Sequence, residues 1–130
     1  MIKDRAPYPA AQMRRLSEQF AECRTVFSAL GDSTRQSILI ALMQNYGGLR
    51  VGELAKASNL SRATVSHHLK ILMKAGLIGC YEKGTMNFYH VDADSDVWGT
   101  VSSLSDNARA LLSDYRTKRE NGFEQWKREG

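Results

Sequence analysis

One segment constrains the fold more than any other: residues 60–78 are typical of a capped helix with two unlike faces, followed by a strand. Ser61 comes directly before the first periodic residue, and a serine hydroxyl there accepts from the free amides of the first helical turn. Gly76 supplies the left-handed residue that commonly ends a helix. Between them, apolar side chains recur at steps of four and three, so they share one face and require burial. They are Val65, Leu69 and Leu72.

The opposite face of this helix is small and basic. Its members are Arg62, Ala63, Ser66, His67, Lys70 and Lys74. Small side chains allow a backbone to approach a groove closely, and Arg, Ser and His side chains donate to base edges or phosphates. Residues 54–81 include no carboxylate at all. A solvated helix on an ordinary α-domain is the alternative, but such helices usually mix both charge signs. A surface of one sign indicates a polyanionic partner.

The residues before this helix complete a familiar motif. Residues 51–58 form a short amphipathic segment, and residues 59–60 make a tight turn into Ser61. Two short helices joined by such a turn predict a helix-turn-helix, with the second helix as the one that reads DNA.

The residues after this helix change their period. Residues 77–81 and 86–91 are predicted as two strands around a turn at residues 82–85, and they are rich in aromatic and β-branched residues. A hairpin in this place forms a wing. Lys83 at its tip is expected to lie beside the DNA backbone or minor groove.

Residues 26–91 together resemble the winged helix-turn-helix of the ArsR/SmtB family of bacterial transcriptional repressors. The run VFSALGDSTR at residues 26–35 is similar to the family's entry into its second helix, and residues 60–70 and 75–78 are close to its reading helix. The resemblance implies a homodimer whose flanking helices form the interface. It also implies that the protein binds a palindromic operator in double-stranded DNA and releases this DNA when an effector binds or a cysteine is modified.

The expected fold is therefore mainly α with a small β-hairpin wing, and a short third strand at residues 49–51 is an option. Residues 1–9 are expected to be a loose lead-in, residues 10–115 the winged helix-turn-helix domain with its dimerisation helices, and residues 116–130 a charged tail, partly helical or mobile. Apolar stripes on both the first and last helices predict a homodimer through them, since a palindrome requires a symmetric protein. The alternative is that these helices only cover their own domain.

Composition sets the outer limits. The 130 residues are 42% apolar, enough for one domain with a real core. The absence of a membrane-length apolar run and of a signal peptide predicts a cytoplasmic protein with no membrane partner. A net charge of +4 suits a nucleic-acid binder. Neither a nucleophile elbow, nor a phosphate loop, nor paired carboxylates support an enzyme. The alternative function, a winged-helix module that binds protein, would be expected to have lost the basic face.

We predict that two groups of residues bind DNA. Base reading is assigned to Arg62, Ala63, Ser66 and His67. Contacts to phosphates are assigned to Ser61, Lys70 and Lys83, with Thr64 assisting.

The signal that controls binding is less constrained. No cofactor and no metal is predicted, because residues 53–57 lack the cysteines of the family's usual metal site and the last helix lacks histidine. Cys23 and Cys80 are either small buried hydrophobes or a redox sensor, which requires a reactive and accessible thiol. A small organic effector at the dimer interface, of unknown identity, or no effector at all, also remains open.

Overall fold

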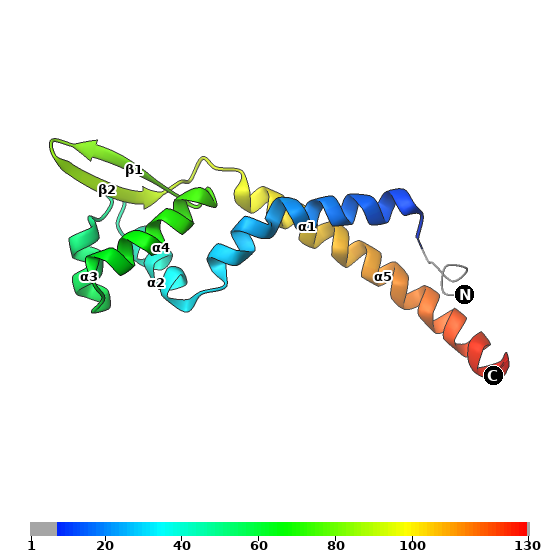
Figure 1. Cartoon of the computed structure of the whole chain (residues 1–130). Coiled ribbons are helices and arrows are strands. Elements are labelled where there is room, and N and C mark those ends of the chain that lie inside the picture. The colour runs from blue at the N-terminus through cyan, green and yellow to red at the C-terminus, as the bar shows by residue number, and fades with distance from the viewer. Residues whose placement is uncertain (1–7, 130) are drawn as a thin grey trace. The chain divides into compact units, whose positions relative to one another are not determined.

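The computed structural model describes residues 8–129, apart from the side chains of Phe123 and Trp126. These residues form five helices and one two-stranded hairpin (Figure 1). The elements are α1 (Ala10–Leu30), α2 (Ser33–Met43), α3 (Val51–Ser58), α4 (Arg62–Lys74), β1 (Ile78–Lys83), β2 (Met86–Val91) and α5 (Val97–Glu129). They separate into two compact units. The winged-helix unit is Arg24–Trp98, and the helical unit joins the described residues up to Cys23 with those from Gly99.

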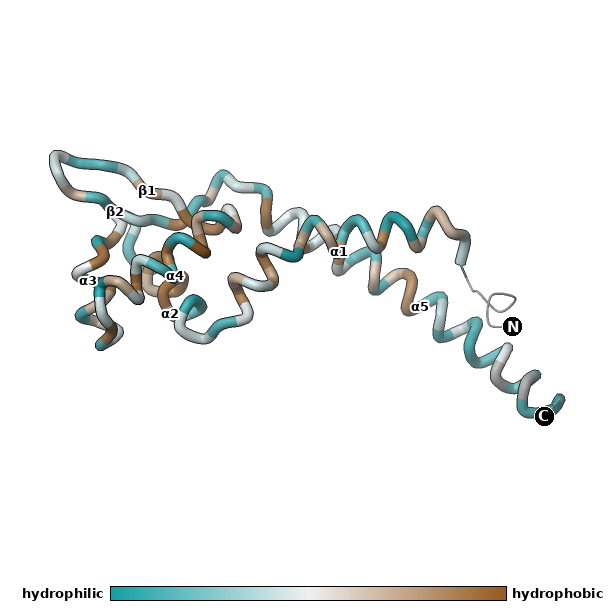
Figure 2. The backbone as a smooth tube through the Cα atoms, viewed as in Figure 1, coloured by the Kyte–Doolittle hydropathy of each residue, from teal (hydrophilic) through white to brown (hydrophobic). Residues whose placement is uncertain are grey.

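The core of the winged-helix unit lies where α2, α3 and α4 meet the base of the hairpin, and the hydropathy colours of Figure 2 show apolar residues gathered there. The largest side chains with less than 2% exposure in this unit are Ile38, Leu42, Leu54, Val65, Leu69, Leu72 and Leu77. Each contributes about 1.5–3 kcal/mol through burial of apolar surface. The three apolar positions predicted on the inner face of α4 are therefore confirmed as core.

Local chemistry fixes where the helices start and stop. The Asp32 carboxylate accepts from the Arg35 backbone N–H at 3.0 Å and so caps α2. This hydrogen bond holds the pKa of the Asp32 carboxyl below its usual value. Asn59 ends α3 in the left-handed region with φ 55°, which asparagine tolerates better than most residues. Gly76 has φ 77°, so its predicted role at the end of α4 is confirmed.

The wing is a longer and tighter hairpin than the sequence predicted. Strand β1 pairs antiparallel with β2 from Ile78↔Val91 to Lys83↔Met86. The predicted turn at residues 82–85 is wrong by two residues, because the strand continues through Lys83. The connection is a two-residue turn in which Gly84 has φ 64°. Glycine at the first central position suits the type II′ turn, whose twist matches that of the flanking strands.

The optional third strand is reduced to one bridge. Leu49 and Tyr89 exchange two backbone hydrogen bonds, of 2.9 and 2.8 Å. No strand extends from this bridge, because α3 begins at Val51 and its helical backbone cannot continue the pairing. A Cβ at Gly48 would lie 2.8 Å from the Tyr89 carbonyl oxygen, so the chain needs glycine to approach the wing this closely.

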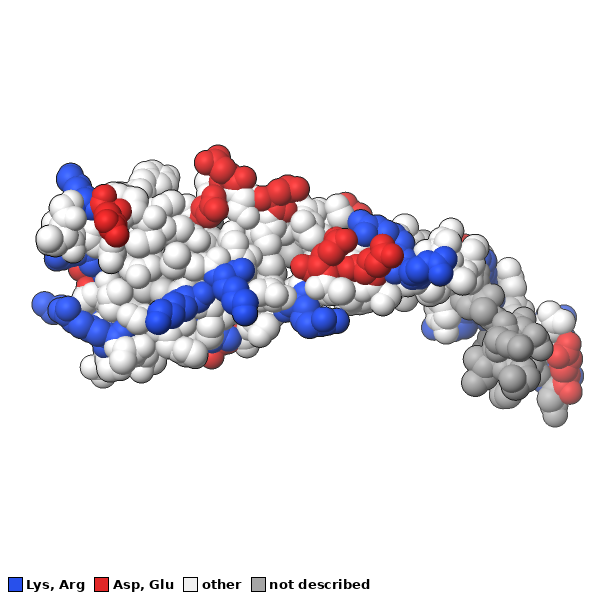
Figure 3. Space-filling model, turned by 45° about the horizontal axis from the view of Figure 1, so that its top comes forward, with Lys and Arg blue, Asp and Glu red and all other residues white. Residues whose placement is uncertain are grey.

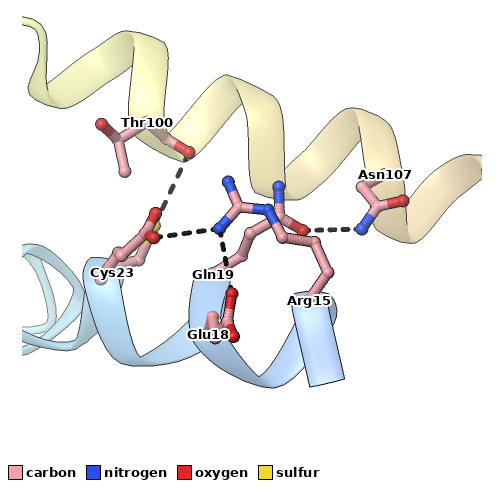
Figure 4. Close-up of polar contacts among 7 residues, drawn as sticks. Arg15, Glu18, Gln19, Cys23, Thr100 and Asn107 are labelled. Atoms are coloured by element: carbon pink, nitrogen blue, oxygen red, sulfur yellow. Dashed lines mark hydrogen bonds and ion pairs between the residues drawn. The ribbon is translucent and has the colours of Figure 1, made fainter. Parts of the chain in front are cut away.

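The helical unit is built on the pairing of α1 with α5 (Figures 1 and 4). The Asn107 amide donates to Gln19 Oε1 at 2.6 Å, and the Cys23 thiol lies 3.7 Å from the Thr100 carbonyl oxygen. The Tyr8 hydroxyl donates to the Leu111 carbonyl oxygen. Helix α5 continues through residues 116–129, so this segment, predicted as a charged tail, is helical. Most of the predicted lead-in, residues 1–7, lies outside the described residues.

Within residues 8–129, no helix combines the length and the hydropathy that crossing a membrane would require.

Candidate nucleic-acid interface

Helix α4 presents its two faces as the sequence predicted. Its inner face is buried in the core. Among the predicted DNA-binding positions, Arg62, Ala63, Thr64, His67 and Lys70 are exposed, and Ser66 is half-buried. Positions four apart, such as Arg62, Ser66 and Lys70, point to the same side of a helix. The structure therefore brings the predicted α4 residues together on one accessible surface.

The start of α4 is held by the Ser61 hydroxyl. This oxygen accepts from the Thr64 backbone N–H at 3.1 Å and donates to Thr64 Oγ1 at 2.8 Å. Both interactions are internal to the cap, so Ser61 serves first to fix the helix start. The Thr64 hydroxyl uses its oxygen as an acceptor here, which leaves its proton available to an outside acceptor.

We expect Ser61→Ala to lower the free energy of unfolding by about 0.5–2 kcal/mol, because the Thr64 amide loses its acceptor. Urea unfolding followed by circular dichroism measures this change. Ser105→Ala, at an exposed position inside α5, is the control and should cost nothing, since alanine favours helix interiors. If the two variants unfold at the same urea concentration, the cap contributes no stability.

A second anchor of α4 is the contact between Arg35 and His68. Arg35 Nη1 lies 3.1 Å from His68 Nδ1. The same guanidinium donates to the carbonyl oxygens of Ala29 at 2.8 Å and Ser28 at 3.1 Å, in the last turn of α1. Because arginine can only donate, His68 must accept through Nδ1 and carry its proton on Nε2. Arg35 thus links the end of α1 to α4 and fixes the tautomer of His68.

The charge on this unit is distributed unevenly. Figure 3 shows Lys and Arg side chains across the lower part of the winged-helix unit in that view, while the Asp and Glu side chains visible there lie mainly along its upper part. The carboxylate-free segment covers α4 together with most of α3. Lys83, the last residue of β1, adds an exposed cation on the wing. The cationic surface formed by α4, most of α3 and Lys83 favours a negatively charged partner.

Arg62 extends this charge toward α3. Its guanidinium lies against Gly52, where an added Cβ would be 2.9 Å from Nη2. It lines a cleft of about 480 Å³ between the start of α3 and the tip of the wing. The other lining residues are Arg50, Val51, Gly52, Glu53, Lys56, Thr85, Met86 and Asn87. The cleft was not apparent in the sequence, because its walls come from three separate elements.

The two cysteines differ in access. Cys23 is fully buried in the helical unit, whereas Cys80 is exposed on β1, and both are free thiols. Cys80 faces Tyr89 across the hairpin. Burial first, and the Cys80 thiol second, raise the pKa of Tyr89 above its ordinary value. Of the two candidate redox sensors, only Cys80 has the solvent access that thiol chemistry requires.

No group of three or more His, Cys, Asp or Glu side chains in the part of the chain that the structure describes is arranged to hold a metal ion.

Sequence reasoning missed three residues of this region. It assigned no contact at this interface to Arg35, Arg50 or Lys56. One sequence feature could have drawn attention to Arg35: it follows the helix cap Asp32 by three residues. Its contact with His68 spans 33 positions in sequence, and local periodicity carries no information on such a distance.

Comparisons with known proteins agree with this geometry. A family profile described as "Bacterial regulatory protein, arsR family" matches residues 32–79. The chain is 38% identical over 77 residues to an HTH-type transcriptional regulator of Methanocaldococcus jannaschii, across 59% of this chain and 85% of that protein. It is 37% identical over 67 residues to the transcriptional repressor SdpR of Bacillus subtilis, across 52% and 72% of the two chains. An ArsR-like transcriptional regulator from Rhodococcus sp. RHA1 has a similar structure, with a TM-score of 0.56 and 25% identity, over 88% of this chain and 97% of that one.

Proposed function

The chain belongs to the ArsR family of bacterial transcriptional regulators, and we propose that it is a homodimeric repressor that binds a palindromic operator in the cytoplasm. It is a transcriptional regulator with a winged-helix DNA-binding domain, and it is not an enzyme. The observation that carries the proposal is the outer surface of α4, which is exposed, cationic and free of carboxylates, on a helix whose other face is locked into the core.

In this proposal α4 enters the major groove, and its side chains contact either bases or phosphates according to their residue type. Arg62 and His67 donate to base edges, while Ala63 and Ser66 allow the close approach that such contacts need. Lys70 and the Thr64 hydroxyl bind backbone phosphates at the edges of the groove. Ser61 contributes mainly by holding the start of the helix in place.

His68 is an additional candidate for a phosphate contact. Its Nδ1 is committed to Arg35, so its Nε2–H is the donor that remains. A half-buried ring held in one tautomer gives up little conformational freedom when it binds.

Dimerisation is supported by apolar surface that the helical unit leaves uncovered. Phe20 on α1 is 50% exposed and Leu112 on α5 is 61% exposed, and Met13 and Tyr115 are exposed as well. Only Gln19, Cys23 and Leu104 are buried among the described residues of this unit. Two paired helices with so small a core need further packing, and a second copy supplies it with the twofold symmetry of a palindrome.

For the control of DNA binding we propose three alternatives, none of which uses a resident metal. They are oxidation of a thiol, with Cys80 the accessible candidate, a small organic ligand, or no ligand at all.

Lys83→Ala should weaken binding to all DNA sequences similarly, because a wing lysine contacts phosphate and not bases. The slope of log affinity against log salt should fall by roughly one unit per subunit. Anisotropy titrations over a range of salt concentrations measure it. An unchanged slope would remove Lys83 from the interface.

The proposed function is tested by fluorescence anisotropy with DNA from upstream of the protein's own gene and with a random duplex of equal length. We expect tight, sequence-specific binding by the reduced protein. Repeating the titration after treatment with a mild thiol oxidant separates the alternatives: binding lost in wild type and kept in Cys80→Ser identifies a thiol switch. Equal affinity for both duplexes would contradict the proposal.

A further inference from the structure

The cleft between α3 and the wing carries more positive charge than its one carboxylate can neutralise. Three cationic side chains line it, those of Arg50, Lys56 and Arg62, against the single carboxylate of Glu53. That carboxylate is already occupied, since it accepts from the Arg50 backbone N–H at 3.0 Å and lies 3.5 Å from Arg50 Nε. Lys56 and Arg62 form no ion pair within residues 8–129. An uncompensated pair of cations at a concave surface favours an anionic occupant.

The shape of the cleft is fixed by the backbone at Gly52 as well as by side-chain contacts. Gly52 has no Cβ, which leaves room for the Arg62 guanidinium to lie against α3. Arg50 Nη1 lies 3.0 Å from Met86 Sδ, so this side chain connects the start of α3 to β2 of the wing. The volume of about 480 Å³ lies within the roughly 300–1,000 Å³ typical of ligand sites and exceeds what a single small ion needs.

From these contacts we infer that the cleft binds a phosphate of the operator backbone, with Lys56 as the cation that contacts it and Arg50 as the residue that links α3 to the wing. The inference rests on the proposed function, because it uses the DNA that α4 reads. Arg62 is the first residue of α4, and Thr85 and Met86 lie at the tip of the wing. The cleft is therefore continuous with the two elements proposed to contact DNA. A DNA strand that passes from the major groove to the wing crosses the opening of the cleft. The negative charge of its backbone phosphate matches the positive charge of the cleft.

Lys56→Gln tests the inference with a duplex that wild-type protein binds specifically. The slope of log affinity against log salt should fall by roughly one unit per subunit, with the preference for operator over random DNA unchanged. Arg14→Gln, which removes one exposed cation from α1, is the control for net charge and should leave the slope unchanged. Thermal melting of both variants verifies that they fold.

Three outcomes would overturn the inference while leaving the proposed function intact. The first is a Lys56→Gln slope equal to that of wild type. The second is an equal loss of slope in Arg14→Gln, which would make the effect one of net charge. The third is a lost preference for operator over random DNA in Lys56→Gln, which would make Lys56 a contact to bases and not to the backbone. Failure of the proposed function differs from all three, because wild-type protein itself would then show no preference for operator DNA.

Discussion

Leu69→Ala is expected to lower the free energy of unfolding by about 2–5 kcal/mol, the range for removing a buried leucine side chain and leaving a cavity. Leu69 is 1% exposed at the centre of α4, the helix that the proposed function depends on. Since small domains have only about 5–15 kcal/mol of stability in total, the variant should also lose much of its DNA binding at 37 °C. Urea unfolding measures the first effect and anisotropy the second.

The control for this prediction is Ile40→Ala in α2. Ile40 belongs to the same unit but is 57% exposed, so its truncation should cost well under half as much. Equal destabilisation by the two substitutions would contradict the assignment of the inner face of α4 to the core.

Arg62→Ala is expected to weaken operator binding by about 1–3 kcal/mol for each half-site, which is the range for one good contact between arginine and a base. The effect should appear twice in a dimer bound to a palindrome. The base preference should relax at one position in each half-site, while binding to random DNA changes little. Anisotropy with operator duplexes substituted at single positions measures both quantities.

An equal loss on operator and random DNA would contradict base reading by Arg62. It would instead group Arg62 with Lys56 as a contact to the backbone, which its position against Gly52 in the free protein makes a specific alternative. Lys74→Gln, at the far end of α4, is the control for loss of one cation from the same helix.

The fold could be predicted where the sequence has a periodic apolar pattern or a local cap or turn residue. Val65, Leu69 and Leu72 repeat at helical spacing, and Ser61 and Gly76 are typical cap residues, so α4 was predicted correctly at both ends. The wing was predicted in kind but not in detail. The turn around Gly84 was taken as four residues long, because polar Glu82 and Lys83 look like a loop when their pairing with β2 is unknown.

The possible third strand shows a different limit. Leu49 does pair with Tyr89, but the pairing ends where α3 begins. The helix start depends on Glu53, whose carboxylate accepts from the Arg50 N–H. This capping contact starts the helix at Val51, directly after the extended Arg50, and so leaves no residues for a longer strand.

The candidate site divides in the same way. Its α4 residues were predictable, because their spacing places them on one face of one helix. The contact between Arg35 and His68 and the cleft around Lys56 were not, because both need elements that meet only in three dimensions. Burial of Cys23 also came from tertiary packing, since the carbonyl of Thr100 covers it from another helix.

The central claim is that two copies of this chain read an inverted repeat through α4. The most direct test is to enrich a pool of random DNA duplexes on the reduced, purified protein and sequence what is retained. The account predicts an inverted repeat whose half-sites are centred about one helical turn, roughly 10 base pairs, or a multiple of it, apart. It also predicts that Arg62→Ala enriches a motif with one position relaxed in each half. Enrichment of no motif, or of one without inverted symmetry, would contradict it.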